Sequence, residues 1–307
     1  MDTTVLMINI LNGLIWGSIL GASAIGLTLL WGVMKVVNIA EGETLLLGSY
    51  IIIWAYMSYG ITPYIGMWMA LIVGAIVGLV VYWALLHKLV GKVEIITLKT
   101  EMSTLLVMFA LSTFLYNAYY YWIGSEPRGI GLWHVGGEVS YVTVGGITLR
   151  VNSIFAAILA ILTAVATHLF LTRTMAGKSI RAVMQDAQAA SLAGIDPVKV
   201  KMLTAILGIG ITAFTGFLVL LHEAAITPEM SHKYAPVAFT IVVLGGLGSV
   251  MGSLIGGFII GLVYGVSKVM VAEYYTPLAA DPIALSTAFI IMVLVLLFRP
   301  QGLFGRR

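Results

Sequence analysis

TRTMAGKSIRAVMQDAQAASLAGIDPVKVK, residues 172–201, is the longest charged, polar run between strongly apolar segments of this chain. Apolar or small residues recur inside it at helical spacing, which predicts one greasy and one solvated face: Ile180, Val183, Met184, Ala187 and Ser191. Gly194 and then Pro197 are typical helix stops. We predict a short amphipathic helix over roughly 178–193 on a membrane surface, and interpret it as a mechanical contact for a partner protein. An ordinary cytoplasmic loop is the alternative.

The composition places the chain in a lipid bilayer. Of its 307 residues 60% are hydrophobic and 9% charged, and the mean hydropathy is +1.05. A soluble domain carries roughly 25% charged residues, so this chain cannot cover a water-facing surface. The net charge of +3 is spread over short loops, which does not indicate a nucleic-acid partner. The chain has no cysteine, which excludes disulfides and cysteine metal sites.

Eight apolar stretches are long enough, or nearly so, to cross about 30 Å of hydrocarbon at roughly 20 residues each. They predict an all-α polytopic membrane protein made of one transmembrane domain, residues 1–307. The stretches lie near residues 5–34, 43–60, 64–86, 102–122, 152–171, 202–221, 237–270 and 284–298.

Lys and Arg in the loops predict the orientation. The loop 172–201 is expected in the cytoplasm, which puts 123–151 outside, and the arginine-rich tail after residue 298 should also be cytoplasmic. Eight single crossings would put the tail and the loop on opposite sides. Because Gly245, Gly246 and Gly248 break the seventh stretch early, we predict that 237–270 is re-entrant or doubled.

Glycines repeat every four residues in the first and seventh stretches. Such stripes let helix backbones approach closely inside a bilayer. We expect helix packing at these positions: Gly13, Gly17, Gly21, Gly248, Gly252, Gly256 and Gly261.

The loop 123–151 holds a candidate β-hairpin. The segments YVTV and ITLRV flank Gly145 and Gly146, which is a plausible turn. This small outer hairpin is expected to cap the bundle or to meet an external partner.

Polar residues at the end of the first span carry a second candidate site. Asn38, Glu41, Gly42 and Glu43 stand where the next helix should enter lipid. One interpretation puts both glutamates in the headgroup zone, with Glu43 in the first turn of a helix over 43–60. The other gives this segment a role in a translocation path or gate, because ionisable groups in a membrane are costly.

Motifs of enzymes are not found in the sequence. Gly177-Lys178-Ser179 resembles the end of a phosphate-binding loop, but Thr172 stands where its first glycine is needed. HExxH, GxSxG and clustered His/Asp ligand sets do not occur. We therefore predict that the chain is not an enzyme and holds no metal.

Four motifs together resemble the LivH-type permease subunits of branched-chain amino acid ABC transporters, in the hydrophobic amino acid uptake family. They occur in the family's order: GLTLLWGVMKVVNIAEGETLLLGSY (26–50), GKSIRAVMQDAQAASLAGID (177–196), VLGGLGSVMGSLIGGFIIG (243–261) and RPQGLFGR (299–306). The resemblance runs from about residue 9 to the end and is weakest over 123–151. Where the family usually has His, this chain has Glu41.

The resemblance implies that the loop 172–201 contains the coupling helix of an ABC importer. Gln188-Ala189-Ala190 and Gly194 are similar to the EAA-x-x-x-G signature of such permeases, with Gln for Glu. The apolar face of helix 178–193 would then be the surface that an ATPase contacts. The implied coupling residues are Gly177, Arg181, Asp186, Gln188, Ala189, Ala190 and Gly194.

The resemblance also implies partners and a location. The chain would lie in the cytoplasmic membrane and pair with a second, LivM-like permease above two LivG/LivF-like ATPases. These ATPases would hydrolyse the ATP, while this chain would bind no cofactor. An extracytoplasmic amino-acid-binding protein would dock on the outer hairpin and deliver a branched-chain or other hydrophobic amino acid.

Three alternatives stay open at this stage. The chain could be a urea- or amide-type member of the same family. It could be a stand-alone secondary transporter or channel, which predicts repeated halves and carboxylates deep in spans. It could be a structural subunit of another membrane complex, which would tolerate changes at Asn38 and Glu41.

Overall fold

The computed structural model describes residues 3–91, 97–130, 141–144, 146–274 and 277–305. Within these ranges, seven helices are long and apolar enough to cross a membrane, which confirms an all-α polytopic membrane protein. They are α1 (Thr3–Met34), α3 (Pro63–Val81) with its π-helical continuation η1 (Tyr82–Gly91), α4 (Leu98–Trp122), α5 (Val151–Arg173), α8 (Pro197–Glu223), α10 (Val250–Tyr274) and α11 (Pro277–Phe298).

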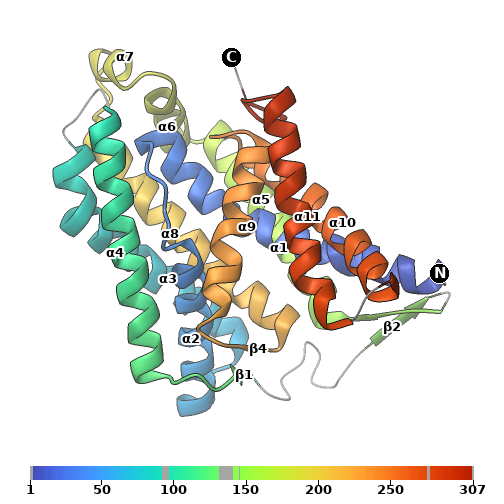
Figure 1. Ribbon diagram of the computed structural model, residues 1–307. Coiled ribbons are helices and arrows are strands. Elements are labelled where there is room, and N and C mark those ends of the chain that lie inside the picture. The colour runs from blue at the N-terminus through green and yellow to red at the C-terminus, as the bar shows by residue number, and fades with distance from the viewer. Residues whose placement is uncertain (1–2, 92–96, 131–140, 145, 275–276, 306–307) are drawn as a thin grey trace.

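Two shorter helices, α2 (Glu41–Tyr59) and α9 (Met230–Gly245), complete the bundle. The stretch expected to be re-entrant or doubled is therefore doubled, as α9 and α10. The chain reverses between them at Gly246 and Gly248, whose φ angles of 98° and 87° favour glycine. As a result the C-terminus lies at the same end of the molecule as α6 and α7 (Figure 1).

The C-terminal tail is docked on this reversal. The Leu303 amide donates to the Leu244 carbonyl at 2.8 Å, and the Phe304 amide donates to the Gly245 carbonyl at 3.2 Å. The two glycine-containing motifs near residues 243–261 and 299–306 thus form one local structure. Arg306 and Arg307 lie outside the described residues.

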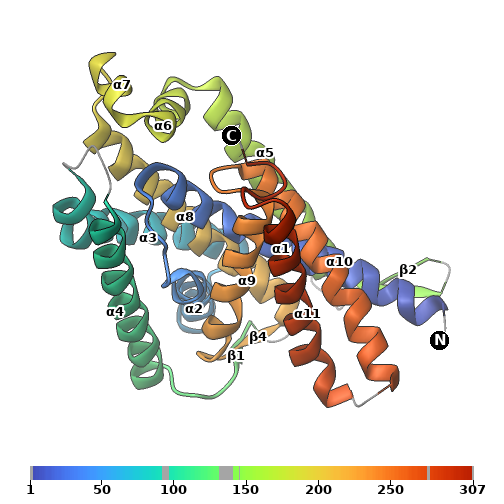
Figure 2. The same ribbon diagram turned by 45° about the horizontal axis from the view of Figure 1, so that its top comes forward.

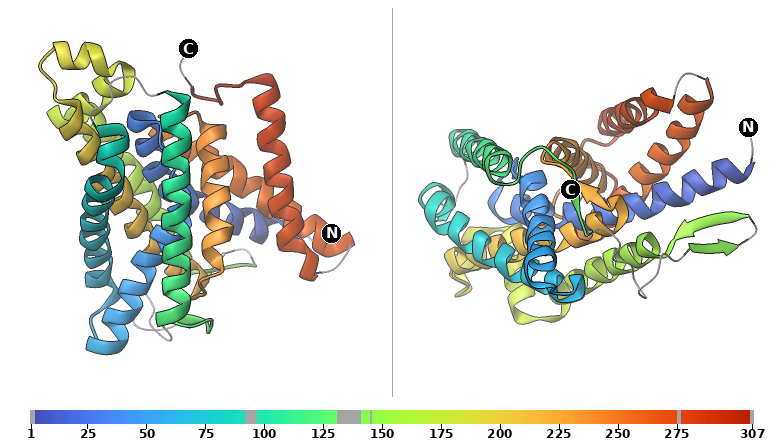
Figure 3. Two further views of the ribbon diagram at one scale, coloured as in Figure 1. Left: turned by 60° about the vertical axis from the view of Figure 1, so that its left-hand side comes forward. Right: turned by 90° about the horizontal axis from the view of Figure 1, so that it is seen from below.

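Helix α1 is the centre of the bundle. It packs against α5, α8, α9 and α10, and most of its side chains, such as Ile19, Leu20 and Ile25, are buried. At 32 residues it is about 48 Å long, so it crosses obliquely between the other helices (Figure 2). By contrast, α4 and α11 stand at the periphery and expose large apolar side chains that suit contact with lipid (Figure 3).

The glycine stripes lie at two helix interfaces. A Cβ on Gly13 would collide with the carbonyl of Gly261 in α10, and one on Gly17 with that of Gly257. Gly21 faces the same helix near Ser253. On the other side of α10, Gly252 and Gly256 pack against α9, while Gly248 is in the reversal. Helix α10 is therefore held closely by backbone contact on two faces.

The expected hairpin is present as β2 (Tyr141–Val144) and β3 (Ile147–Arg150), paired antiparallel with Val142 opposite Leu149. It lies away from α6 and α7 (Figure 1). A second small pairing, β1 (Arg128–Gly129) with β4 (Ala225–Ile226), was not indicated by the sequence. Residues 131–140 and 145 of the predicted outer loop are outside the described residues.

Candidate functional site

The loop 172–201 folds into two helices that project from one end of the bundle, α6 (Met175–Gln185) and α7 (Ala187–Leu192) (Figures 1 and 2). The prediction of one helix over 178–193 is wrong. Asp186 is extended, with φ −157° and ψ 110°, and its Oδ1 accepts hydrogen bonds from the amides of Gln188 and Ala189 at 2.8 and 3.0 Å. It is the N-cap of α7, and such a residue favours a break over a continuous helix.

The greasy face of α6 points into the chain's own bundle. Ile180 is 0% exposed and Val183 is 4% exposed, and α6 packs against α1, α5 and α8. Gly177 is buried in the same interface, because a Cβ there would collide with the Phe170 carbonyl. The expectation that this face contacts an ATPase is therefore wrong, since its side chains are already buried against helices of this chain.

The outward surface of α6 and α7 is made by other residues. Of the predicted coupling residues Ala190 is buried, whereas five are exposed: Arg181, Asp186, Gln188, Ala189 and Gly194. Gly194 has φ 84°, which ends α7 in the left-handed conformation. The sequence reasoning missed Leu192, whose side chain is 91% exposed. The sequence did indicate Leu192, because it is a large apolar residue in a polar loop and does not belong to the helically spaced apolar positions.

Met184 joins α6 to two other elements. A Cβ on Gly32, near the end of α1, would lie 2.6 Å from Met184 Cε. A Cβ on Gly248, in the reversal before α10, would lie 3.2 Å from its Sδ. Met184 therefore packs against the end of α1 and against the reversal before α10.

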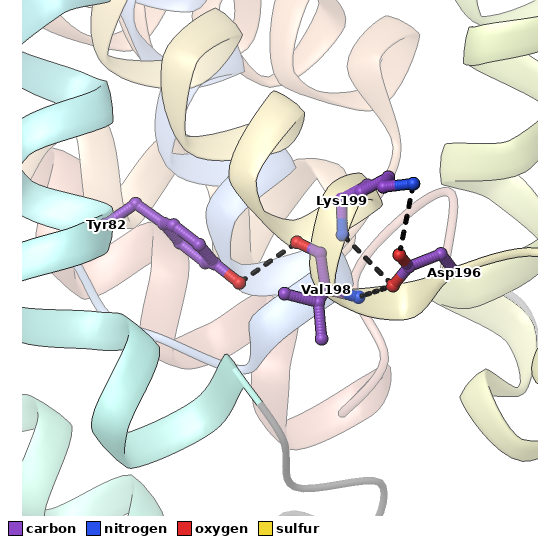
Figure 4. Close-up of polar contacts among 4 residues, drawn as sticks. All are labelled: Tyr82, Asp196, Val198 and Lys199. Carbon is purple, nitrogen blue, oxygen red and sulfur yellow. Dashed lines mark hydrogen bonds and ion pairs between the residues drawn. The ribbon is translucent and has the colours of Figure 1, made fainter.

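A second set of contacts joins η1 to the start of α8 (Figure 4). Asp196 caps α8 by accepting from the amides of Val198 and Lys199 at 2.9 and 3.4 Å. The Tyr82 hydroxyl donates to the Val198 carbonyl at 3.0 Å. One turn on, Lys201 is 2% exposed and its Nζ donates to the Val90 carbonyl at 2.8 Å. Two hydrogen bonds thus tie η1 to the first two turns of α8.

The other candidate segment is a break between α1 and α2. Helix α1 ends at Met34, Lys35 has φ 53°, and the chain is then non-helical until α2 begins at Glu41. This connection turns back into the bundle, so that α2 begins in its interior (Figure 1). Non-helical backbone at membrane depth requires protein or a wet cavity around it.

Both glutamates of this segment are inside the protein, at 1% exposure each. Glu41 accepts from Asn38 Nδ2 at 2.9 Å and from the Thr212 hydroxyl of α8 at 2.8 Å. Glu43 accepts through its backbone carbonyl from the Tyr119 hydroxyl of α4 at 2.8 Å. Its Oε2 has no hydrogen-bond partner among the described residues. Both carboxylates are therefore enclosed by protein, and their depth in the membrane, on which the headgroup and gate interpretations differ, stays a prediction.

Close backbone contacts fix α2 against its neighbours. A Cβ on Gly42 would collide with the Ser231 carbonyl of α9, and a Cβ on Gly48 with the Ala213 carbonyl of α8. Asn38, Glu41, Gly42 and Glu43 thus lie together where α2 meets α8 and α9. The predicted coupling residues form a separate group at the end of the bundle.

The fold and these two groups of residues define a multi-span membrane permease with a projecting pair of helices. The sequence profile of the family described as branched-chain amino acid transport system / permease component matches residues 9–298. The chain therefore belongs to this family of transport permeases.

Named relatives span nearly the whole chain. The high-affinity branched-chain amino acid transport system permease protein LivH of Escherichia coli (strain K12) is 31% identical, covering 96% of this chain and 94% of the relative. The corresponding BraD protein of Pseudomonas aeruginosa is 27% identical, covering 97% and 95%. A probable LivH of Methanocaldococcus jannaschii is 31% identical, covering 96% and 92%. No solved structure matches the chain significantly.

Membership in this family has three consequences. The chain is an integral, multi-pass membrane protein, and a transport permease subunit is not in itself an enzyme. Permeases of ABC transporters work together with ABC partner subunits.

Proposed function

We propose that this chain carries branched-chain or other hydrophobic amino acids across the cytoplasmic membrane, driven by separate ATPase subunits that contact α6 and α7. The observation that carries the proposal is the projecting α6–α7 unit, with exposed polar groups and Leu192 at its tip, in a chain that matches the permease family over residues 9–298. The substrate named for the relatives supports the same class of solute.

The proposed assembly contains a second permease, two ABC ATPases and an extracytoplasmic binding protein. The ATPases hydrolyse the ATP, and this chain binds no cofactor. With α6 and α7 in the cytoplasm, the β2–β3 hairpin faces the binding protein, because the hairpin is at the other end of the bundle.

We infer that movement of α6 and α7 reaches the interior of the bundle by two routes. One passes through Met184 to the end of α1 and the reversal before α10. The other passes through Asp196, which caps α8. Further along α8, the Thr212 hydroxyl donates a hydrogen bond to Glu41. A rigid helix transmits such a displacement along its axis, so a shift of α8 changes the contact at the α1–α2 break.

The segment Asn38–Glu43 is the proposed gate on the translocation path. Its burial supports this proposal, because Asn38 and Glu41 are 3% and 1% exposed and Asn38 donates a hydrogen bond to Glu41. The gate would open when Glu41 exchanges its hydrogen bonds with Thr212 and Asn38 for hydrogen bonds with water or substrate. Interior carboxylates of membrane proteins mark solute pathways more often than they stabilise the fold.

Uptake by the purified assembly in proteoliposomes tests this function. The chain is purified with a tag after mild solubilisation, its partners are identified, and uptake of radiolabelled leucine is measured with and without internal ATP. We expect ATP-dependent accumulation that unlabelled isoleucine and valine inhibit and that urea and acetamide do not. Inhibition by urea or acetamide instead would assign the chain to the amide-type members, and uphill uptake by the chain alone would exclude the ABC mechanism.

A further inference from the structure

A second polar region lies at the end of the bundle away from α6 and α7. It is a cavity of about 450 Å³ where the first half of α1 meets the β2–β3 hairpin, the start of α5, the ends of α8 and α10 and the starts of α9 and α11. Small-molecule sites typically enclose about 300–1,000 Å³. The residues that matter here are Trp16, Glu223, Lys233, Tyr264, Lys268 and Asp281.

The cavity contains charges of both signs. Lys268 Nζ lies 2.7 Å from Asp281 Oδ1, which also accepts from the Tyr264 hydroxyl at 2.6 Å. Lys233 Nζ lies 3.7 Å from Glu223 Oε1. Charged side chains on membrane helices are costly and face the interior or a wet cavity where they have a function. With Arg150 of β3, five charged side chains from five different elements line this one cavity among the described residues.

The Lys233–Glu223 pair is loosely held, and Glu223 Oε1 also accepts a hydrogen bond from the Tyr234 hydroxyl at 3.1 Å. At 3.7 Å the two atoms are beyond direct hydrogen-bond distance, although they remain close enough to attract each other. Lys233 is instead held over the rings of Trp16 and Tyr234, at 5.7 and 5.8 Å from their centroids. A carboxylate can bind the ammonium of Lys233 while an ammonium binds the carboxylate of Glu223, which matches the two charged groups of an amino acid.

Two more features of the lining fit a small amphipathic ligand. The rings of Trp16 and Tyr264, which both line the cavity, are stacked at 4.4 Å, and the ammonium groups of Lys233 and Lys268 lie 5.7 Å from their respective centroids. His222 also lines the cavity, and its buried Nδ1 has no hydrogen-bond partner among the described residues. A buried polar atom without a partner is destabilising, and a ligand that bonds it removes that cost.

We propose that this cavity is a binding site for a free α-amino acid, with the ligand carboxylate on Lys233, its ammonium on Glu223 and its side chain against Trp16 and Tyr264. The site lies on the side where substrate enters if α6 and α7 are cytoplasmic. This inference rests on the proposed function for the solute class, and it is distinct from the gate at Asn38–Glu43.

Analogues of leucine that lack one charged group test the site. Equilibrium binding to the purified assembly is measured for leucine, for leucinamide, which lacks the carboxylate, and for 4-methylpentanoate, which lacks the ammonium. The wild type should bind leucine more tightly than either analogue. Lys233→Gln should weaken leucine by at least about tenfold and bring leucine and leucinamide to equal affinity. Glu223→Gln should likewise weaken leucine binding by at least about tenfold and bring leucine and 4-methylpentanoate to equal affinity.

Controls separate recognition from folding. Lys233→Arg keeps the charge and should retain the preference for leucine over leucinamide. Lys99→Gln, on the exposed first turn of α4, should bind all three ligands as the wild type does. Equal weakening of all three ligands in Lys233→Gln and Glu223→Gln would show a structural ion pair and overturn the proposal.

Two further results would also overturn it. Wild-type affinities in both variants would exclude these residues from the site. Competition by O-phosphoethanolamine but not by leucine would assign the cavity to a lipid headgroup. ATP-driven leucine uptake by the same wild-type assembly distinguishes the two levels: uptake with a failed analogue test refutes only the site, whereas no uptake of any amino acid refutes the proposed function.

Discussion

At the scale of single residues, Glu41 makes the contact on which the proposed gate depends. Its two carboxylate oxygens each accept one hydrogen bond, from Asn38 and from Thr212. Glutamine has a carbonyl oxygen and an NH₂ group, so in Glu41→Gln one of these two donors would face another donor. The variant tests the gate without a change in side-chain volume.

We expect Glu41→Gln to insert normally and to lower leucine uptake about tenfold, because a hydrogen bond to a charged group contributes about 1.5–3 kcal/mol. The measurement is the initial uptake rate at equal amounts of chain in the membrane. Glu126→Gln, in an exposed loop, is the matched control and should be unaffected. A wild-type rate for Glu41→Gln would remove Glu41 from the path.

Some residues could be placed from the sequence, and others could not. The unusual position of Glu41 and Glu43 was visible as two carboxylates beside a span, but their depth was not, because burial depends on how α8 and α9 pack around them. Lys201 counted as one more loop cation, yet it is buried and bonds Val90, 111 residues away in the chain. Contacts of that separation leave no local pattern.

At the scale of elements, α7 exists as a separate helix because of the Asp186 cap. The sequence pattern of apolar spacing continued through this position, whereas the capping capacity of Asp186 outweighs it locally. The same reasoning explains why the apolar stripe, correctly located, was assigned the wrong partner: periodicity identifies a face and not what covers it.

Asp186→Ala should remove the α7 cap at a cost of about 1 kcal/mol. We expect ATP hydrolysis by the assembly to continue while leucine uptake falls, because a loosened α7 transmits less movement. The readout is the number of ATP molecules hydrolysed per leucine carried. Asp186→Asn keeps a capping side chain and should restore the ratio, and an unchanged ratio in Asp186→Ala would argue against α7 as the coupling element.

The α1–α10 interface makes its own prediction. A Cβ on Gly257 would collide with the Gly17 carbonyl, whereas a Cβ on Gly210 would meet its neighbours at ordinary contact distances of 3.4–3.5 Å. Gly257→Ala should destabilise the protein by about 1–3 kcal/mol, and Gly210→Ala should be nearly neutral. Thermal unfolding in detergent compares them. Equal melting temperatures would show that α1 and α10 are less closely packed than described.

At the scale of the whole molecule, eight apolar stretches were counted and the seventh was doubled. Hydropathy measures only the length of an apolar stretch. It therefore counted α9 and α10 as one stretch, because the reversal between them is made of glycine and small residues. The distribution of Lys and Arg indicated that one crossing was missing from the count, because it predicted the tail and the loop 172–201 on the same side of the membrane. The structure places both at one end (Figure 1). Their membrane side stays a prediction.

The absence of native cysteine makes this topology directly testable. Leu192→Cys, at the exposed tip of α7, should react with a membrane-impermeant thiol reagent only in inside-out vesicles. Tyr141→Cys, 55% exposed in the hairpin, should react only in intact cells or spheroplasts. Labelling of both residues from one side would contradict the arrangement of the helices.

The central claim is that an ATPase outside this chain drives transport through α6 and α7, and crosslinking at Leu192 measures it most directly. A photoreactive amino acid at Leu192, in membranes where the chain supports leucine uptake, is irradiated with and without ATP. We predict one major adduct, to an ABC ATPase subunit, whose yield changes with nucleotide. Adducts to lipid alone, with uptake intact, would contradict the account.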